Sequence, residues 1–349
     1  MNNPVLILTQ TMEGWQAVFA FQVLHLPAEE WLKMRWGFNA GALFDEALDR
    51  YKLFIESQAV NEAEFLAGIT QNNTLAMRGI HSPEFGLRMV LLGRSCAPTI
   101  DQARQAARQY AREVSSIFPH DFLLVPAKTE DEYYQLSGEH LLTGDSKMAQ
   151  IQRGIVFLPT ERGPRYLVGL WQASSRSNEQ IWRALSAMPQ LALFNIMIQP
   201  SILYEGEKHA LLDIKKSISS VDQNNEQVSA YIPWAESYIK RRLAVWKKFF
   251  LVQIHLVADE GMDNLLRSIG SALTRDSNDM ALPGYQTLYP ISPLEGQQWL
   301  ENIRSLELVQ NSQHLDEIAD VDEVFSIFRF PYRPEAGLPG ANFTAEPQT

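Results

Sequence analysis

The sequence has almost no cysteine. Cys96 is the single cysteine among 349 residues, so no disulfide can form within the chain and a thiolate metal cluster lacks its ligands. The first residues, MNNPVLILTQTMEGW, lack the basic and long apolar regions of a signal peptide. No apolar run approaches the roughly 20 residues of a transmembrane helix. We therefore expect a cytoplasmic protein without a transmembrane segment.

The common catalytic signatures are also missing. The sequence contains no phosphate-binding P-loop motif, no GxGxxG fingerprint, no HExxH and no GxSxG. Its seven histidines are scattered, with no pair at metal-ligand spacing. The sequence thus predicts no catalytic residue, no cofactor and no metal site. His255, Asp259 and Glu260, in and just after one apolar strand, leave open an enzyme of unrecognised type.

The composition that remains is that of a globular protein. Hydrophobic residues make up 46% of the chain and charged residues 20%, and eight tryptophans can contribute to a large core. The net charge of −11 argues against a nucleic-acid footprint covering the whole surface. A local basic patch remains compatible with it.

Hydrophobic periodicity predicts an α+β fold in four segments. Residues 1–60 are expected to be mostly helical, and 61–150 to form a hairpin, a helix and a strand. Residues 151–310 have the element order of a ferredoxin-like split βαβ unit, with a helical hairpin inserted at 204–248. Residues 311–349 form an acidic helix and a strap rich in proline and glycine.

The expected ferredoxin-like unit uses the strands RYLVGLW, LFNIMIQ, FLVQIHLVA and YQTLYPI. We expect an antiparallel sheet with helices on one face. Asn195, Gln253 and His255 fall on one face of the two central strands, which we expect to be solvated. The tripeptide Arg-Gly-Ile opens both 78–80 and 153–155, which is a weak signal of an internal repeat about 75 residues apart.

A basic cluster stands out against the acidic background. Tyr238 and Trp246 are interleaved with five cations that we expect on one helix: Lys240, Arg241, Arg242, Lys247 and Lys248. These side chains are possible contacts for nucleic-acid phosphates. The alternative is a solvated helix face whose cationic end favours the helix dipole.

The C-terminal segment carries the string DVDEVFSIFRFP, an acidic helix followed by an aromatic-proline pair and then GLPG. With LRMVLLGRS and FNIMIQP, it resembles the region that precedes the motor domain in HerA/FtsK-like and conjugative type IV secretion ATPases. The resemblance spans roughly residues 85 to 343 in element order, and the P-loop motor itself is absent from this sequence.

The resemblance implies a non-catalytic assembly or adaptor module in a bacterial DNA-translocating or secretion-type complex. Its partner would be a P-loop motor ATPase or a homo-oligomer of the chain, with nucleic acid as a possible further ligand. The residues expected to dock on the partner are Asp320, Asp322, Glu323, Phe325, Phe328, Arg329, Phe330 and Pro331.

Overall fold

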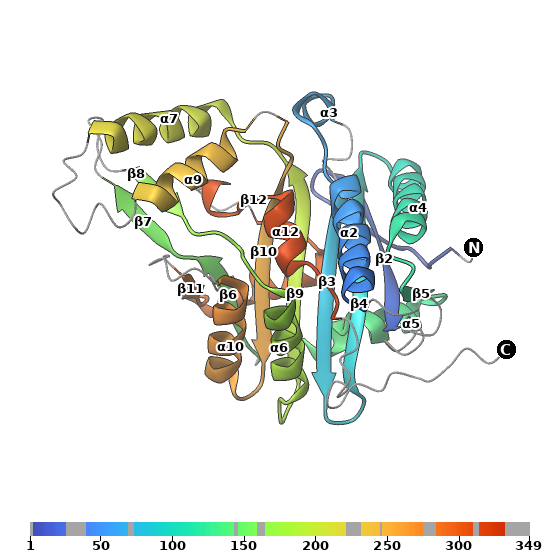
Figure 1. Cartoon of the computed structure of the whole chain (residues 1–349). Coiled ribbons are helices and arrows are strands. Elements are labelled where there is room, and N and C mark those ends of the chain that lie inside the picture. The colour runs from blue at the N-terminus through green and yellow to red at the C-terminus, as the bar shows by residue number, and fades with distance from the viewer. Residues whose placement is uncertain are drawn as a thin grey trace.

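The computed structural model describes residues 3–25, 40–68, 73–142, 146–158, 165–220, 232–244, 246–274, 284–309 and 314–331. A ten-stranded sheet runs through the molecule (Figure 1). Every strand pair in it is antiparallel. The prediction of an α+β fold with a mainly antiparallel sheet is confirmed.

The main path of the sheet has the order β1-β2-β4-β3-β9-β10-β6-β11, with β5 pairing β2 and β12 pairing β10. Its strands are β1 (Ile7–Thr11), β2 (Gly14–His25), β3 (Asn73–Ser82), β4 (Gly86–Ala97), β5 (Phe122–Pro126), β6 (Lys147–Arg153), β9 (Ala192–Ser201), β10 (Phe249–Ala258), β11 (Tyr285–Leu288) and β12 (Ile318–Asp320).

Helices cover both faces of this sheet, so the expectation of helices on one face only is wrong. One face packs against the large core shared by α2 (Ala40–Gln58), α4 (Ile100–Ile117), α6 (Ser175–Ser186), α10 (Met262–Thr274) and α12 (Val321–Ile327). In Figure 1, α12 lies beside α2 and above α6 on this face, and it contacts both. The opposite face packs against α5 (Glu130–Ser137) and α11 (Pro293–Ser305).

The alternation of side chains along β3 makes the two layers visible. Leu75 and Met77 belong to the large core, whereas Ala76 between them packs on the other face with Met197 and with Tyr133 of α5. Successive side chains of a strand point to opposite faces, so a strand buried on both sides reads as nearly continuous apolar sequence. This explains why all ten residues of β10 are buried.

The expectation of a solvated polar sheet face is wrong. Asn195 and His255 are buried, and so is Gln253, whose amide bonds the backbone of the segment after α11. The Gln253 Nε2 donates to the Val309 carbonyl at 2.5 Å, and the Val309 N–H donates back to Oε1 at 3.3 Å. For Gln253, hydrogen bonds to this covering layer take the place of water.

The same strand order occurs twice. The series β2-α2-β3-β4-α4-β5 forms the order β5-β2-β4-β3, and the series β6-α6-β9-β10-α10-β11 forms β11-β6-β10-β9. The two halves join where β3 pairs with β9, with Arg78 opposite Asn195. The Arg-Gly-Ile repeat does not follow this relation, because its copies lie on β3 and at β6, which hold different places in the two halves.

A smaller layer packs at one end of β10. It consists of the two-stranded sheet β7 (Ile155–Leu158) and β8 (Arg165–Val168) with the helices α7 (Glu205–Ser220) and α9 (Ile232–Arg242). The remaining short elements are α3 (Glu62–Leu66), η1 (Glu139–Leu141) and η2 (His314–Asp316). The expected helical hairpin at 204–248 corresponds to α7 and α9, although 221–231 lie outside the described residues.

Two other boundaries need correction. The expectation of helix in the N-terminal segment is wrong for residues 7–25, which form the antiparallel hairpin β1–β2. It holds for α2, and residues 26–39 lie outside the described residues. The strand expected at 165–171 does not join the main sheet, since β8 pairs only with β7 and the place beside β10 belongs to β6. The hairpin, helix and strand expected in 61–150 are present as β3–β4, α4 and β5. Within the described residues, no helix combines the length and apolar character needed to span a membrane.

Candidate functional site

The acidic helix α12 begins with a capping box. The Asp320 Oδ1 accepts hydrogen bonds from the backbone N–H groups of Asp322 at 3.0 Å and Glu323 at 3.1 Å. The Glu323 Oε2 accepts from the Asp320 N–H at 3.0 Å. The Asp-x-x-Glu spacing therefore sets the start of the helix locally. It also places two fully buried carboxylates side by side.

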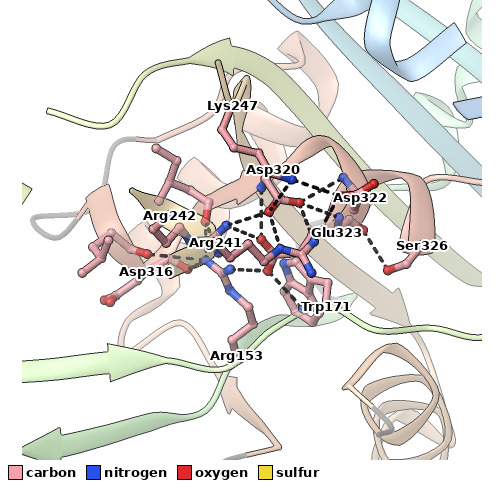
Figure 2. Close-up of polar contacts among 12 residues, drawn as sticks. Arg153, Trp171, Arg241, Arg242, Lys247, Asp316, Asp320, Asp322, Glu323 and Ser326 are labelled. Carbon is pink, nitrogen blue, oxygen red and sulfur yellow. Dashed lines mark hydrogen bonds and ion pairs between the residues drawn. The ribbon is translucent and has the colours of Figure 1, made fainter. Parts of the chain in front are cut away.

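Two buried arginines from distant parts of the chain meet the Glu323 carboxylate (Figure 2). Arg153, the last residue of β6, donates from Nη1 to Oε1 at 2.9 Å, and Arg242, the last residue of α9, pairs with Oε2. The Trp171 backbone N–H also donates to Oε1, at 3.2 Å. A buried carboxylate held by two guanidiniums and a backbone donor is fully compensated.

The same two arginines bind the backbone just before α12. The Arg153 Nη2 donates to the carbonyls of Asp316 and Ile318, both at 2.8 Å. The Arg242 Nη2 donates to the Ile318 carbonyl at 3.2 Å. These contacts fix η2 and β12 against β6 and α9, segments separated from them by more than 70 residues.

Further cations surround the two aspartates toward the surface. Arg241 forms two hydrogen bonds to the Asp320 carboxylate, one of them at 2.5 Å. Asp322, less buried, pairs with the Lys247 Nζ at 3.0 Å and with the Lys52 Nζ of α2 at 2.8 Å. We call Arg153, Arg241, Arg242, Lys247, Lys52, Asp320, Asp322 and Glu323 the buried charge cluster.

The cluster shifts the pKa values of its members. Burial alone would raise the pKa of Asp320, but the Arg241 hydrogen bond and the positive charges of Arg242 and Lys247 outweigh it and lower the pKa to about 2. Burial disfavours the charged form of Arg242, yet the carboxylate of Glu323 raises its pKa above the ordinary value. Asp320 and Arg242 therefore stay ionised at neutral pH.

An aromatic anchor follows the cluster. Phe328 and Phe330 are buried, and the Phe330 ring lies 5.6 Å from that of Trp182, centroid to centroid. The Trp182 Nε1 and the Asn178 Nδ2 both donate to the Arg329 carbonyl, at 3.3 and 3.1 Å. The Tyr51 hydroxyl accepts from the Phe330 N–H at 3.2 Å. The chain up to Pro331 is thereby built into the large core.

The eight residues expected to dock on a partner thus have mainly an internal role. Asp320, Glu323, Phe328, Arg329, Phe330 and Pro331 are buried, which leaves a partner no access to them. Asp322 and Phe325 are half-buried, and Asp322 is paired with lysines. These side chains fix the segment to the chain's own body.

The basic residues likewise have a different arrangement from the expected one. Helix α9 ends at Arg242, and Lys247 and Lys248 lie in the connection to β10, so the five cations do not share one helix. Arg241, Arg242 and Lys247 face the carboxylates of 320–323. Lys240 is exposed and Lys248 half-buried. No local sequence pattern indicates that the basic and acidic segments meet.

The three residues considered for catalysis do not converge. His255 is buried on the face covered by α11, where its ring lies 6.0 Å from Trp299, whereas Asp259 and Glu260 are exposed in the turn after β10. Burial lowers the pKa of His255 to about 4, and the charge of Arg78 adds to the shift. His255 is neutral and enclosed, whereas Asp259 and Glu260 are exposed, so the three side chains do not form one acid–base group.

Buried polar contacts also hold the face opposite the cluster. Arg78 on β3 is fully buried and donates to the Asn195 Oδ1 at 2.9 Å, and to the carbonyls of Ser137 and Ile303 at 2.6 Å each. Sequence reasoning missed Arg78 and Arg153, since a lone arginine at a strand carries no signal of burial. Among the described residues, no group of three or more His, Cys, Asp or Glu side chains is placed to hold a metal ion.

Comparison with known proteins adds no relative. No protein-family model matches the chain, and no curated protein matches it. The resemblance to the region preceding HerA/FtsK-like motors therefore depends on its quoted strings and element order, and remains a prediction.

Proposed function

We propose that this chain is a non-catalytic assembly or adaptor module that works beside a HerA/FtsK-like P-loop motor ATPase. The observation that carries the proposal is the anchoring of residues 318–331, the segment with the strongest resemblance to the region before such motors. Buried ion pairs to β6 and α9 and an aromatic cluster on α6 hold it. A module that positions a motor needs this segment to be held rigidly against the module's own body.

The architecture of the sheet also supports an assembly or adaptor module. We interpret each half as a ferredoxin-like unit, because the order β5-β2-β4-β3 and the order β11-β6-β10-β9 both match a βαββαβ series with the first strand between the third and fourth. In the second half the helices α7 and α9 stand between β9 and β10, as the inserted hairpin would. Two such units joined edge to edge make a broad, stiff platform on which a partner can be placed.

The test is assembly with the motor. The purified full chain, mixed with a purified HerA/FtsK-like ATPase encoded beside it, should co-elute in size-exclusion chromatography with light scattering and should change the ATPase rate. The chain alone should not hydrolyse ATP. A chain that leaves both the elution and the rate of the ATPase unchanged would contradict the proposal.

A second candidate, nucleic-acid binding, is favoured by one observation. Trp246 is 93% exposed and holds a positive φ of 72°, and it lies between the exposed Lys240 and the half-buried Lys248. An exposed aromatic ring beside cations suits stacking on an unpaired base. The carboxylates that face Arg241 and Arg242 oppose it.

The test uses single-stranded DNA at low salt. If this candidate is right, Trp246→Ala should weaken binding at least tenfold, and binding should fall steeply as salt rises. Leu66→Ala, at another exposed apolar side chain, is the matched control and should bind as the parent does. Absence of binding by the parent chain at low salt would eliminate the candidate.

A further inference from the structure

An exposed apolar patch lies where β11 leads into α11. Four large apolar side chains within seven residues are exposed there: Leu288 37%, Tyr289 52%, Ile291 94% and Leu294 75%. Single exposed apolar residues are ordinary, but a contiguous group of this kind marks a contact surface. None of these residues belongs to the buried charge cluster.

The same patch adjoins an open sheet edge. β11 is the last strand on the sheet path, and within the described part of the chain no strand pairs with its outer side. The Gly154 N–H donates to the Gly284 carbonyl at 2.8 Å, so these two residues form a hydrogen-bonded pair. Hydrogen-bonded and non-hydrogen-bonded pairs alternate along the antiparallel β11–β6 ladder. The backbone of Gln286 and Leu288 therefore faces β6, and the N–H and C=O groups of Tyr285 and Thr287 point outward.

A cavity of about 700 Å³ opens beside the patch. Its lining includes Lys147, Arg267 and Asp263, together with Tyr289 and Ile291 from the patch. The Tyr289 hydroxyl donates to the Asp263 Oδ1 at 3.5 Å, and the Arg267 Nη2 donates to the Asn264 Oδ1 at 2.9 Å. Two cations against one acid leave the lining with a net charge of +1, in a chain whose net charge is −11.

We propose that this surface, defined by 285–294 with Lys147 and Arg267, binds an extended peptide segment of a partner that is both acidic and apolar. The segment adds as a strand to the outer edge of β11 through Tyr285 and Thr287. Its apolar side chains cover Leu288 and Ile291, and an acidic side chain enters the cavity. The inference rests on the proposed function, since it names the docking surface of an assembly module.

Edge addition gives affinity through main-chain hydrogen bonds and specificity through alternate side chains. A second copy of the chain fits this surface less well. In a two-fold contact the same patch meets itself, so the positive lining would face its own copy. Charge complementarity thus favours an acidic partner segment.

The experiment is a peptide-display selection on the immobilised full chain. A library of random twelve-residue peptides should yield sequences with Asp or Glu next to alternating Val, Ile or Phe. A synthetic peptide from that pool, measured by fluorescence anisotropy, should bind at least tenfold more weakly to Arg267→Glu. Arg104→Glu, at a half-buried cation on α4, should bind as the parent does.

A backbone variant tests the strand addition. Thr287→Pro removes an outward N–H without touching the bonds to β6, and proline is tolerated on sheet edges. It should weaken peptide binding at least tenfold, while Thr287→Ala changes it less than twofold. Thermal melting of Thr287→Pro close to that of the parent would show that the fold is retained.

Three outcomes would overturn the inference. The first is a selection that yields no peptides or only basic ones, and the second is peptide binding that Thr287→Pro leaves intact. The third is a dimer in light scattering that Thr287→Pro dissociates. A dimer of that kind would assign the β11 edge to a second copy of the chain. If the selection fails while the chain still assembles with the ATPase, only the inference falls. If the peptides bind and the ATPase does not, only the proposed motor partner falls.

Discussion

Replacing Glu323 by glutamine should destabilise the protein strongly. The side chain is fully buried, with Oε1 accepting from Arg153 and the Trp171 N–H, and Oε2 facing Arg242 and the Asp320 N–H. A glutamine amide has one acceptor oxygen, so either orientation turns an N–H₂ donor toward other donors. The substitution also removes the negative charge between two buried guanidiniums.

The magnitude follows from these losses. A buried donor without an acceptor costs about 1–3 kcal/mol, and breaking a buried ion pair by removing one partner costs about 3–5 kcal/mol. Because Arg153 keeps its bonds to the carbonyls of Asp316 and Ile318, we expect a total of about 3–5 kcal/mol rather than the sum of both terms.

Equilibrium urea unfolding at pH 7 measures this free energy. Glu301→Gln is the matched control, because Glu301 makes an exposed pair with Arg304 at 3.6 Å, and the free energy of unfolding should stay close to the parent value. A loss of less than about 1 kcal/mol for Glu323→Gln would refute the view that the cluster is a buried and compensated ion-pair network.

Two other predictions concern single buried positions. The folded-state pKa of His255, about 4, lies below the ordinary 6.5, so the folded protein binds fewer protons than the unfolded chain and loses stability as pH falls from 6.5 toward 4. Urea unfolding at pH 5 and pH 7 should show this dependence of the unfolding free energy on pH, and His255→Gln should reduce it by up to one proton. A slope equal in both proteins would contradict the assignment. Gly93→Ala should lower the free energy of unfolding by about 1–3 kcal/mol, because a Cβ there lies 2.1 Å from the Phe19 Cζ and forces the ring to move. Gly206→Ala meets no atom within 4 Å and should not destabilise, so equal urea midpoints for the two variants would contradict the prediction.

Sequence reasoning recovered the elements whose signals are local. Thr99 as an N-cap and Pro119 after the helix marked α4, which spans Ile100–Ile117. The apolar runs of β9 and β10 were equally clear. The N-terminal hairpin was missed, because the apolar run VFAFQVL in β2 has no clear period and a strand buried on both faces resembles a buried helix.

The sequence predicts the acidic half of the candidate site but not its pairing with the basic residues. The Asp320-x-x-Glu323 spacing is a capping-box pattern, so the helix start was within reach of the sequence. The partners of its carboxylates lie 79 and 170 residues away, at Arg241 and Arg153. Nothing in the local sequence distinguishes a cation that will be buried against a distant acid from one on a solvated face, so the sequence alone predicts a surface for both segments.

The basic segment at 241–247 and the acidic segment at 320–323 are partners of each other. A double-mutant cycle on Arg241 and Asp320 tests it most directly, with Arg241→Met, Asp320→Asn and the double variant compared by urea unfolding. The structure predicts a coupling free energy of about 1–3 kcal/mol, because the two residues share two hydrogen bonds around a buried carboxylate. Effects that add to within about 0.3–0.5 kcal/mol would contradict it.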